Sequence, residues 1–471
     1  MNIDPSIFRG YDIRGLVGKQ LNSDVYHQLG KAFATFLYRR QINECTVGQD
    51  IRETSEEYKK AFVKGLMESG IDVWDIGLTL TQIVYFSQYH FLSKAGACIT
   101  ASHNPREYNG LKLANGFSDT LITSEMQELK AISESGEFKK FDREAKYIQK
   151  DIFEDYKKDL FKRIPMYDCG LRVVIDSSCA TTGKFLPDIL RTAGCTVIEQ
   201  NTNLDPTFPL GTPDPTEKSV LERLSKRVLE EKADLGLTYD SDGDRVGVVD
   251  SQGRLLWNDL LVSIFSSDIL HYLPESPIIF NALCSKVVSD TIVRDGGKPV
   301  MWLTGHSFIK SKVKEQRAPF GGELSGHFFF MDNFYGHDDG AFSTLRLLAY
   351  LKRTGKSLKD VVDQLPVYIS SPEIKLGLAD DIKFDFIKNV ISGDIKSIFT
   401  NANYTDIDGF RADTDDEMVI IRASQNGPYI TIKFEGRTQD QYDNLKYKVS
   451  EILKKHSEID WSQGVNIHAF E

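Results

Sequence analysis

The chain has 471 residues, of which 41% are hydrophobic and 27% charged, a composition typical of globular proteins. At about 100–150 residues per domain, this length predicts three or four domains rather than one core. The formal net charge of −11 argues against general binding to nucleic acid or to an anionic membrane surface, because both need a basic face. We therefore expect no nucleic-acid partner and no membrane partner.

The sequence gives no sign of a targeting segment. No stretch approaches the roughly 18 uncharged apolar residues of a membrane span. Residues Met1 to Pro5 contain neither a basic segment nor an apolar one, so we expect no signal peptide. The six cysteines stand singly, without a Cys-x-x-Cys pair, and we interpret them as reduced core residues of a cytoplasmic protein.

Three segments share one order of elements, namely strand, loop, helix, glycine stop and strand. They span residues 45–74, 171–198 and 277–302, and each has the pattern of a parallel βαβ unit. A spacing of about 100–130 residues indicates repeated domains rather than a solenoid, whose period is roughly 20–50 residues. We therefore predict three similar α/β domains in series.

The C-terminal part breaks this pattern. Residues 418–421 form a short apolar run, residues 429–434 alternate like a half-buried antiparallel strand, and residues 439–455 read as a closing helix. These features predict a smaller α+β domain. The expected fold class is thus α/β, and the expected domains are residues 1–150, 151–253, 254–367 and 368–471.

Near the N-terminus, Tyr11 and Arg14 lie in a glycine-flanked segment, Phe8 to Gly15. A guanidinium offers a rigid fork for phosphate. An ordinary turn with solvated charges is the alternative.

The first chemical motif is Thr100 to Pro105, which follows an apolar run, Ala95 to Ile99, that reads as a buried strand. Ser102 therefore lies just past the carboxyl end of a strand, where open α/β sheets keep their chemistry. Beside the imidazole of His103, this hydroxyl can be a nucleophile or carry a phosphoryl group. A serine that bonds its own turn is the alternative.

Asp240 to Arg245 is the strongest motif, and it lies between two predicted strands, 233–239 and 246–249. In an extended loop, carboxylates at every second position point the same way, which is costly unless a cation neutralises them. Oxygen ligands select Mg²⁺ or Mn²⁺. An EF-hand is excluded because its required glycine and glutamate are replaced by Arg245 and Ser251. A solvated acidic turn remains the alternative.

Two further motifs lie in the third domain. Gly305 to Lys310 follows a strand and would place His306 and Lys310 on a loop, although a buried structural histidine is the alternative. Glu323, Ser325 and His327 alternate in a glycine-flanked loop, which suits sugar hydroxyls because each offers a different hydrogen-bonding character. An inert turn is the alternative there, and no His-x-x-x-His or cysteine partner supports metal binding by Glu323 and His327.

In the last domain, Arg422 to Pro428 connects two predicted strands. The guanidinium, the Ser424 hydroxyl, the Asn426 amide and the backbone at Gly427 together form a nest suited to phosphate. An ordinary hairpin would look similar.

Together these motifs resemble the α-D-phosphohexomutase family. That family has a phosphoserine loop, Thr-x-Ser-His-Asn-Pro, a metal loop, Asp-x-Asp-x-Asp-Arg, and a sugar loop, Gly-Glu-x-Ser-x-His. In this chain they are Thr100–Pro105, Asp240–Arg245 and Gly322–His327, and Tyr11 to Arg14 matches the family's N-terminal Tyr-Asp-Ile-Arg. Their order and spacing agree over essentially the whole chain.

The resemblance implies four domains around a central active-site cleft and an isomerase that interconverts hexose 1-phosphate and hexose 6-phosphate. Phosphate on Ser102 would pass to the sugar, giving a bound 1,6-bisphosphate, and the other phosphate would return. The implied partner is a small phosphosugar, the implied cofactors are Mg²⁺ and glucose 1,6-bisphosphate as activator, and the protein would be a monomer or homodimer.

The resemblance also implies roles for individual residues. The metal ligands would be Ser102, through its phosphate, with Asp240, Asp242 and Asp244. The catalytic residues would be Ser102, His103, Lys112, His306, Arg14 and Arg245. The substrate-binding residues would be Tyr11, Lys310, Glu323, Ser325, His327, Arg422, Ser424, Asn426 and Gly427.

Two features bear on the substrate. Where the family usually has Gly/Asn-Thr-Glu-Pro after the last serine, this chain has Gln425 to Pro428, which alters the phosphate loop. Leu324 is similar to the methionine of the bifunctional phosphomannomutase/phosphoglucomutase branch, whereas the glucosamine-specific branch typically has glutamine there. A phosphoglucosamine mutase, a metal-dependent sugar-phosphate phosphatase and a non-catalytic phosphosugar sensor are the alternatives.

Overall fold

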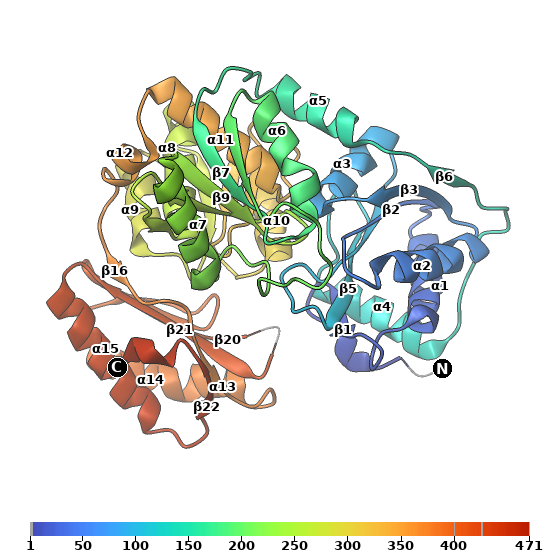
Figure 1. Cartoon of the computed structure of the whole chain (residues 1–471). Helices are drawn as coiled ribbons and strands as arrows, with labels where there is room; N and C mark the ends of the chain where they lie inside the picture. Colours follow the sequence, from blue (N-terminus) through green and yellow to red (C-terminus); the bar gives the residue numbers. More distant parts are fainter. Residues whose placement is uncertain (1–2, 400, 425–426, 471) are drawn as a thin grey trace. The chain divides into compact units, whose positions relative to one another are not determined.

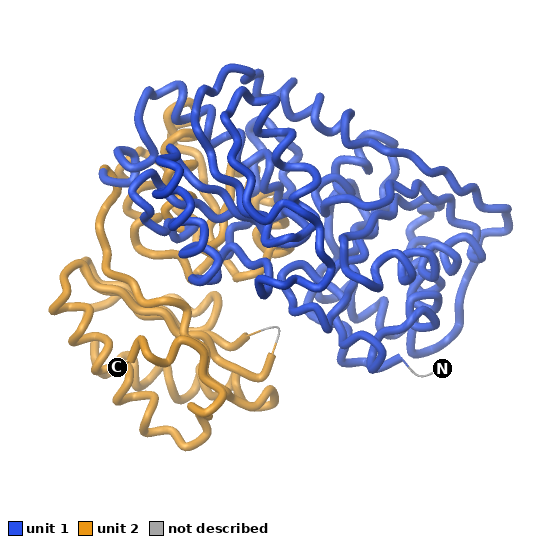
Figure 2. Tube along the Cα trace, in the orientation of Figure 1, with its two compact units in different colours: residues 1–258, 325–363 blue, residues 259–324, 364–471 orange. Residues whose placement is uncertain are grey.

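A computed structural model describes residues 3–399, 401–424 and 427–470 of the chain, which divides into two compact units (Figure 2). Unit 1 comprises Met1–Asn258 and Ser325–Asp363, and unit 2 comprises Asp259–Leu324 and Gln364–Glu471. Among the described residues, no helix combines the length and the apolar character that a membrane crossing requires.

The first sheet of unit 1 carries the Ser102 loop, Thr100 to Pro105. Its strand order is β1 (Ile13–Leu16), β5 (Tyr108–Ala114), β4 (Ala95–Ile99), β2 (Glu44–Gln49), β3 (Asp72–Leu78) and β6 (Tyr147–Gln149), with β1, β2, β3 and β5 labelled in Figure 1. Its helices are α1 (Ser23–Arg39), α2 (Ser55–Glu68), α3 (Thr81–Phe91) and α4 (Thr123–Ser135), preceded by the 3-10 turn η1 (Pro5–Ile7). β4, β2, β3 and β6 run parallel, and β5 is antiparallel to both of its neighbours. Every residue of β4 is buried, as expected for a strand whose sequence is a continuous run of apolar and small residues.

The second sheet of unit 1 carries the acidic motif, Asp240 to Arg245. Its strand order is β11 (Leu255–Leu256), β10 (Val246–Asp250), β9 (Leu235–Tyr239), β7 (Arg172–Asp176) and β8 (Thr196–Gln200). The other elements of this part are α5 (Phe153–Arg163), η2 (Thr181–Lys184), α6 (Leu186–Thr192), α7 (Lys218–Glu231), β15 (Phe328–Phe330), α11 (Gly340–Thr354) and α12 (Leu358–Val362). β9 and β10 are antiparallel neighbours, so the chain must reverse between them, and the acidic residues occupy this reversal.

Unit 2 contains a parallel sheet and an antiparallel one. The parallel strands are β13 (Lys298–Trp302), β12 (Pro277–Asn281) and β14 (Phe320–Gly322), with α8 (Asn258–Tyr272), α9 (Lys286–Arg294) and α10 (His306–Glu315). The antiparallel order is β18 (Asn403–Thr405), β19 (Phe410–Asp413), β20 (Glu417–Ala423), β21 (Tyr429–Gly436), β17 (Ile374–Gly377) and β22 (Asp460–Val465), with β16 (Ile369–Ser370) also on β21. Its helical elements are α13 (Lys383–Phe386), the π-helix η3 (Ile387–Ile391), α14 (Ser392–Ile398), α15 (Gln439–Lys454) and η4 (Ile467–Phe470).

The three predicted βαβ units are confirmed. The parallel strand pairs are β2 with β3, β7 with β8 and β12 with β13, each joined through a helix. The C-terminal α+β character is also confirmed, since the last sheet is antiparallel throughout and α15 packs on β21. The apolar side chains of this sheet and of α15 form one core.

Two local predictions were wrong. Residues 305–310 were expected to form a loop, but α10 begins at His306, so His306 and Lys310 are one turn apart on a helix. Gly305, with φ of 136°, ends the preceding loop in a conformation that side-chain-bearing residues rarely adopt. The acidic residues were expected in an extended loop, but the chain turns there at Gly243, whose φ is 79°.

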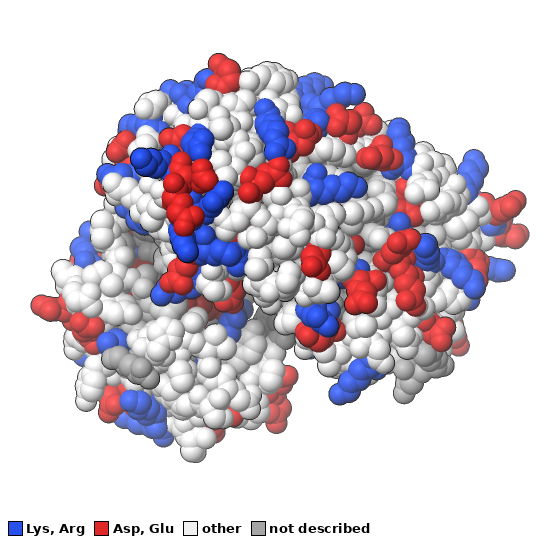
Figure 3. Space-filling model, viewed as in Figure 1, with Lys and Arg blue, Asp and Glu red and all other residues white. Residues whose placement is uncertain are grey.

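Surface charges of both signs are interspersed on the face shown in Figure 3. Independently of this view, some exposed charges of the described helices pair one helical turn apart, as in Glu56 with Lys60 and Lys218 with Glu222. Such exposed pairs contribute little stability individually.

One buried carboxylate joins two helices of unit 1. Asp339 caps the N-terminus of α11 by accepting a hydrogen bond from the Phe342 N–H at 2.8 Å. It also accepts the Tyr156 hydroxyl of α5, at 2.8 Å to Oδ2. Burial raises the pKa of Asp339 to about 7, because a charged carboxylate is poorly solvated there.

We predict that Asp339→Asn changes how stability depends on pH. A raised carboxyl pKa means that the native state holds its proton while the unfolded state has lost it, so stability falls as pH rises from about 4 to about 7, by up to ~1.4 kcal/mol per pH unit. An asparagine does not titrate, so the variant lacks this loss of stability. The difference in melting temperature, variant minus wild type, should therefore be larger at pH 8 than at pH 4.5. An equal difference at both pH values would contradict the raised pKa of Asp339.

Candidate active site

The Ser102 loop begins where β4 ends at Ile99, as the sequence predicted. Ser102 is buried and has a left-handed backbone conformation, with φ of 48°. Its N–H donates to Thr100 Oγ1 at 2.9 Å, and the Asn104 N–H donates to the Ala101 carbonyl at 2.9 Å. These bonds close a tight turn with the serine at its apex.

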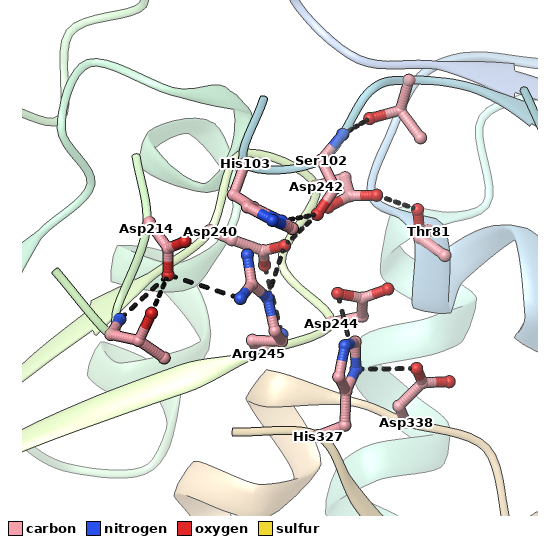
Figure 4. A network of polar contacts seen from close by, with 12 residues as sticks. Thr81, Ser102, His103, Asp214, Asp240, Asp242, Asp244, Arg245, His327 and Asp338 are labelled. Carbon is pink, nitrogen blue, oxygen red and sulfur yellow. Dashed lines mark hydrogen bonds and ion pairs between the residues drawn. The ribbon is translucent and has the colours of Figure 1, made fainter. Parts of the chain in front are cut away.

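The Ser102 hydroxyl contacts both an acid and an imidazole (Figure 4). Oγ donates to Asp240 Oδ2 at 2.7 Å and lies 3.1 Å from His103 Nδ1. Asp240 is 138 residues away in the chain, so the fold brings the two strongest motifs together. Burial and the positive charge of Arg245 hold the pKa of His103 well below its usual range, which favours the neutral imidazole.

Asp240, Asp242 and Asp244 form one buried cluster in the turn between β9 and β10. Each can offer one carboxylate oxygen such that these oxygens lie within 4.8 Å of one another. Burial and mutual repulsion raise the pKa of Asp240 well above its usual value and that of Asp244 to about 6. The sequence prediction that these carboxylates converge is therefore confirmed, although a turn rather than an extended strand brings it about.

Two cations compensate this charge. Lys112 Nζ lies 2.8 Å from Asp242 Oδ2 and 2.5 Å from Asp244 Oδ2, and Arg245 Nε lies 3.2 Å from Asp240 Oδ2. Although burial opposes it, the lysine keeps the pKa of Asp242 far below its usual range. The two aspartates in turn raise the pKa of Lys112, against the effect of burial.

The cluster fits a hard divalent cation. Among the described residues, Asp242 Oδ1 and Asp244 Oδ1 are buried without a hydrogen-bond partner. A buried carboxylate oxygen without a partner is costly, and a cation with oxygen ligands would satisfy it. The donor set thus matches the Mg²⁺ expected from the sequence.

Arg14, which the family resemblance implies is catalytic, lies beside the Ser102 loop. β1 pairs with β5 so that Arg14 is opposite Gly110. The Arg14 guanidinium donates to the Ala101 carbonyl at 3.2 Å and to the Asn104 side chain, and its Nε lies 2.8 Å from Asp12 Oδ2. Tyr11 is half-buried just before this strand.

His327 joins this cluster within unit 1. Its Nδ1 lies 2.9 Å from Asp338 Oδ2 and 3.8 Å from Asp244 Oδ1 (Figure 4). Asp338 was not identified from the sequence, because nothing local marks it as a partner of a histidine eleven residues earlier. Ser325 lies in the turn before β15 and is half-buried.

Two further residues of the acidic cluster's surroundings were missed. Thr81, the first residue of α3, donates its hydroxyl to Asp242 Oδ2 at 2.7 Å and its N–H to the Asp242 carbonyl at 3.0 Å. Asp214 Oδ1 lies 3.3 Å from Arg245 Nη1 and also accepts the Thr216 hydroxyl at 2.7 Å. Despite burial, Arg245 and His103 keep the pKa of Asp214 below its usual range. Nothing in the local sequence, Pro213 to Pro215, marks Asp214 as a partner of Arg245.

In unit 2, predicted substrate-binding residues are connected by hydrogen bonds to the segment before α10. Glu323 Oε1 accepts the Gly305 N–H at 2.7 Å, next to His306. Asp408 Oδ2 accepts the Thr304 N–H at 3.0 Å and Arg422 Nε at 2.8 Å. Asp408 is therefore the connection that sequence reasoning missed.

The remaining predicted ligands of unit 2 also have defined places. Lys310 is buried on α10, and Ser424 directly follows β20, with its N–H donating to the Tyr429 carbonyl at 3.0 Å. The Gly427 carbonyl accepts Lys383 Nζ at 2.8 Å. Asn426 lies outside the described residues.

Family profiles cover most of the chain. Those described as phosphoglucomutase/phosphomannomutase, alpha/beta/alpha domains I, II and III, match residues 5–140, 153–253 and 257–368. The phosphomannomutase/phosphoglucomutase of Pseudomonas syringae pv. tomato is 35% identical over 450 residues, covering 96% of this chain and 95% of its own. The phosphoglucomutase of Neisseria meningitidis serogroup A is 32% identical over 461 residues, covering 98% and 99% respectively.

Solved structures have the same fold. A phosphoglucomutase/phosphomannomutase family protein from Burkholderia thailandensis superposes with a TM-score of 0.88 at 29% identity, covering 96% of this chain and 98% of its own. An N-acetylphosphoglucosamine mutase from Aspergillus fumigatus, solved with GlcNAc-6P and magnesium, gives a TM-score of 0.59 at 12% identity, covering 97% and 96%. At that identity the likeness concerns the fold alone.

We predict that Asp242→Asn weakens Mg²⁺ binding by more than ~10-fold, since removal of a ligand should cost at least as much as removal of an outer partner. Isothermal titration with MgCl₂ measures the affinity, and the Mg²⁺-dependent rise in melting temperature gives a second readout. Asp75→Asn is the matched control, because Asp75 is equally buried but is paired with Lys59 outside the cluster, at 2.8 Å. An Asp242 variant that titrates like wild type would refute the ligand assignment.

Proposed function

The chain belongs to the phosphoglucomutase/phosphomannomutase family, and we propose that its Ser102 carries the phosphoryl group that moves between the two ends of a hexose phosphate. Proteins of this family interconvert hexose phosphates, and this chain is a phosphohexomutase. The observation that supports Ser102 is the 2.7 Å hydrogen bond from its hydroxyl to Asp240 inside a buried acidic cluster flanked by two cations.

The proposed reaction starts from phosphate esterified to Ser102 Oγ. A hydroxyl oxygen of the bound hexose phosphate attacks phosphorus, so that a P–O bond forms to the sugar, the P–Oγ bond breaks, and the proton lost by the sugar is balanced by one gained at Oγ. The bound 1,6-bisphosphate then turns over. Ser102 Oγ then attacks the phosphorus of the other phosphate, the P–O bond to the sugar breaks, and the proton lost by Oγ is balanced by one gained at the sugar oxygen. This step regenerates the phosphoserine and releases the isomer.

Phosphoryl transfer of this kind depends mainly on positioning and on neutralising charge. Arg245 and Lys112 supply fixed positive charge next to Ser102 and the aspartates. Asp240, Asp242 and Asp244 would hold Mg²⁺ together with an oxygen of the phosphoserine, and the bound ion would neutralise charge on the phosphoryl group.

We assign proton transfer to Lys112 and His306, and the environment of the phosphoserine to Arg14 and His103. His103 Nδ1 is within hydrogen-bond distance of Oγ, at 3.1 Å. Glucose 1,6-bisphosphate would phosphorylate Ser102 initially, as an activator. A variant of the Aspergillus fumigatus mutase was solved with this same bisphosphate.

For unit 2 we propose contacts with the substrate. Arg422, Ser424, Asn426 and Gly427 would hold the phosphate that does not react, and Glu323 the sugar hydroxyls, with Lys310 as a further ligand. For unit 1, Tyr11, Ser325 and His327 complete the proposed binding set. The domain limits given above, 1–150, 151–253, 254–367 and 368–471, are part of this proposal.

The proposed substrates are mannose and glucose phosphates rather than glucosamine phosphates. The relatives at 35% identity are named for both mannose and glucose. Leu324 packs against an apolar cluster that includes Ala282, Leu283, Met418 and Ile420. A glutamine amide at this position would lose solvent without an evident partner, so Leu324 acts by shaping the loop between Glu323 and Ser325.

We predict that Ser102→Ala lowers mutase activity by at least ~1,000-fold with little change in fold, because it removes the atom that carries phosphate. The assay offers mannose 1-phosphate, glucose 1-phosphate and glucosamine 1-phosphate, each with Mg²⁺ and a trace of glucose 1,6-bisphosphate. Ser177→Ala is the matched control, since Ser177 is also buried and follows a strand but lies outside the site.

Two results would contradict the proposal. Near-normal activity of the Ser102 variant would remove that serine from the mechanism. Inorganic phosphate that accumulates in step with free sugar would indicate a phosphatase, because a mutase must retain its bisphosphate and exclude water.

A further inference from the structure

Arg52 is a buried arginine that touches the Ser102 loop without belonging to any motif considered above. It lies in the segment between β2 and α2 and is 3% exposed. A buried guanidinium is expensive unless its hydrogen-bond donors are satisfied. The groups that satisfy them therefore show what the residue does.

The Arg52 guanidinium donates to four carbonyl oxygens, three in the loop after β4 and one at Tyr108, the first residue of β5. Nη2 donates to the Ser102 carbonyl at 2.7 Å and to the Asn104 carbonyl at 2.6 Å. Nη1 donates to the Pro105 carbonyl at 2.9 Å and to the Tyr108 carbonyl at 3.0 Å. The Ser102, Asn104 and Pro105 carbonyls lie in an irregular segment without strand pairing, so this one side chain supplies hydrogen bonds that a sheet would otherwise provide.

A second residue fixes the orientation of this guanidinium. Asp50 Oδ2 lies 3.2 Å from Arg52 Nε, and Asp50 Oδ1 accepts the Arg52 N–H at 3.0 Å. Asp50 Oδ1 also accepts the Ser55 hydroxyl at 2.5 Å, and that hydroxyl accepts Asn109 Nδ2 at 3.1 Å. Asn109 belongs to β5, so the network ties the guanidinium to the sheet that carries the loop.

The loop needs such support because Ser102 is strained. A left-handed backbone, φ 48° here, costs a non-glycine residue ~1 kcal/mol or more and persists only where its surroundings enforce it. This conformation directs Oγ to Asp240. The bond from Arg52 to the Ser102 carbonyl acts on the strained residue itself.

We propose that Arg52 is a positioning residue that holds Ser102 in the conformation required for phosphoryl transfer, an inference that rests on the proposed role of Ser102. Arg52 uses its Nη groups on backbone carbonyls, so it acts through the loop and not on phosphate. The guanidinium is required because its planar fork serves four acceptors at once, whereas the ammonium of lysine has three donors and no fixed plane.

The test compares Arg52→Lys with wild type in mutase turnover. A displaced serine slows the chemical step while sugar-phosphate contacts made by other residues persist, so kcat should fall by ~30-fold or more and KM should change by less than ~3-fold. Arg52→Ala should lose more activity than Arg52→Lys. Guanidinium added at tens of millimolar should restore part of that activity, because it supplies both the positive charge and the planar set of N–H donors. Urea at the same concentration should not.

Arg223→Lys is the matched control for lost stability. Arg223 pairs with the buried Asp176 at 2.7 Å and donates to the Ser178 hydroxyl at 2.7 Å, in a turn outside the site. It should lower the melting temperature while kcat stays near wild type. Asp50→Asn provides a second route if the arginine variants fail to fold, and it should lower kcat several-fold with KM retained.

The outcomes separate this inference from the function on which it rests. If Ser102→Ala is inactive and Arg52→Lys or Asp50→Asn has wild-type kcat, the positioning role is refuted and the proposed function stands. A loss of kcat in Arg223→Lys equal to that in Arg52→Lys would also refute it, since stability alone would then explain both. If Ser102→Ala is active, the proposed function itself fails.

Discussion

The structure of the site depends on the compensation of buried negative charge. Asp240, Asp242 and Asp244 are fully buried within one turn of chain, and their repulsion would open that turn if nothing opposed it. Lys112 and Arg245 oppose it directly. Because two carboxylate oxygens still lack a hydrogen-bond partner in the described structure, the site retains the capacity for a further cation. The same charged groups therefore stabilise the fold and form the candidate cation site.

The reacting serine is held by residues from separate parts of the chain. Thr81 supports the acidic turn, Asp214 orients Arg245, and Arg52 gathers the carbonyls of the Ser102 loop. None of them needs to touch a substrate. Their common effect is to fix the positions of charges and of one oxygen atom, which is what phosphoryl transfer asks of a protein.

Sequence reasoning proposed the residues that act but missed several residues that contact them in the structure. Ser102 and Asp240 were predictable because each follows a buried strand, β4 or β9, in a distinctive local pattern. Arg52, Asp214 and Asp408 were not, because Ser102, Arg245 and Arg422, which they contact, are 50, 31 and 14 residues away and only the fold brings them together. The segment after Gly305 was assigned to a loop because its polar residues masked the start of a helix.

The central claim is that Ser102 and the three aspartates surround one divalent cation. The most direct measurement is anomalous diffraction from crystals of the phosphorylated protein soaked in MnCl₂, since Mn²⁺ takes the oxygen ligands of Mg²⁺ and scatters anomalously. The account predicts one strong peak within bonding distance of Asp240, Asp242, Asp244 and a phosphate oxygen on Ser102. A peak elsewhere, with no anomalous density between these carboxylates, would contradict it.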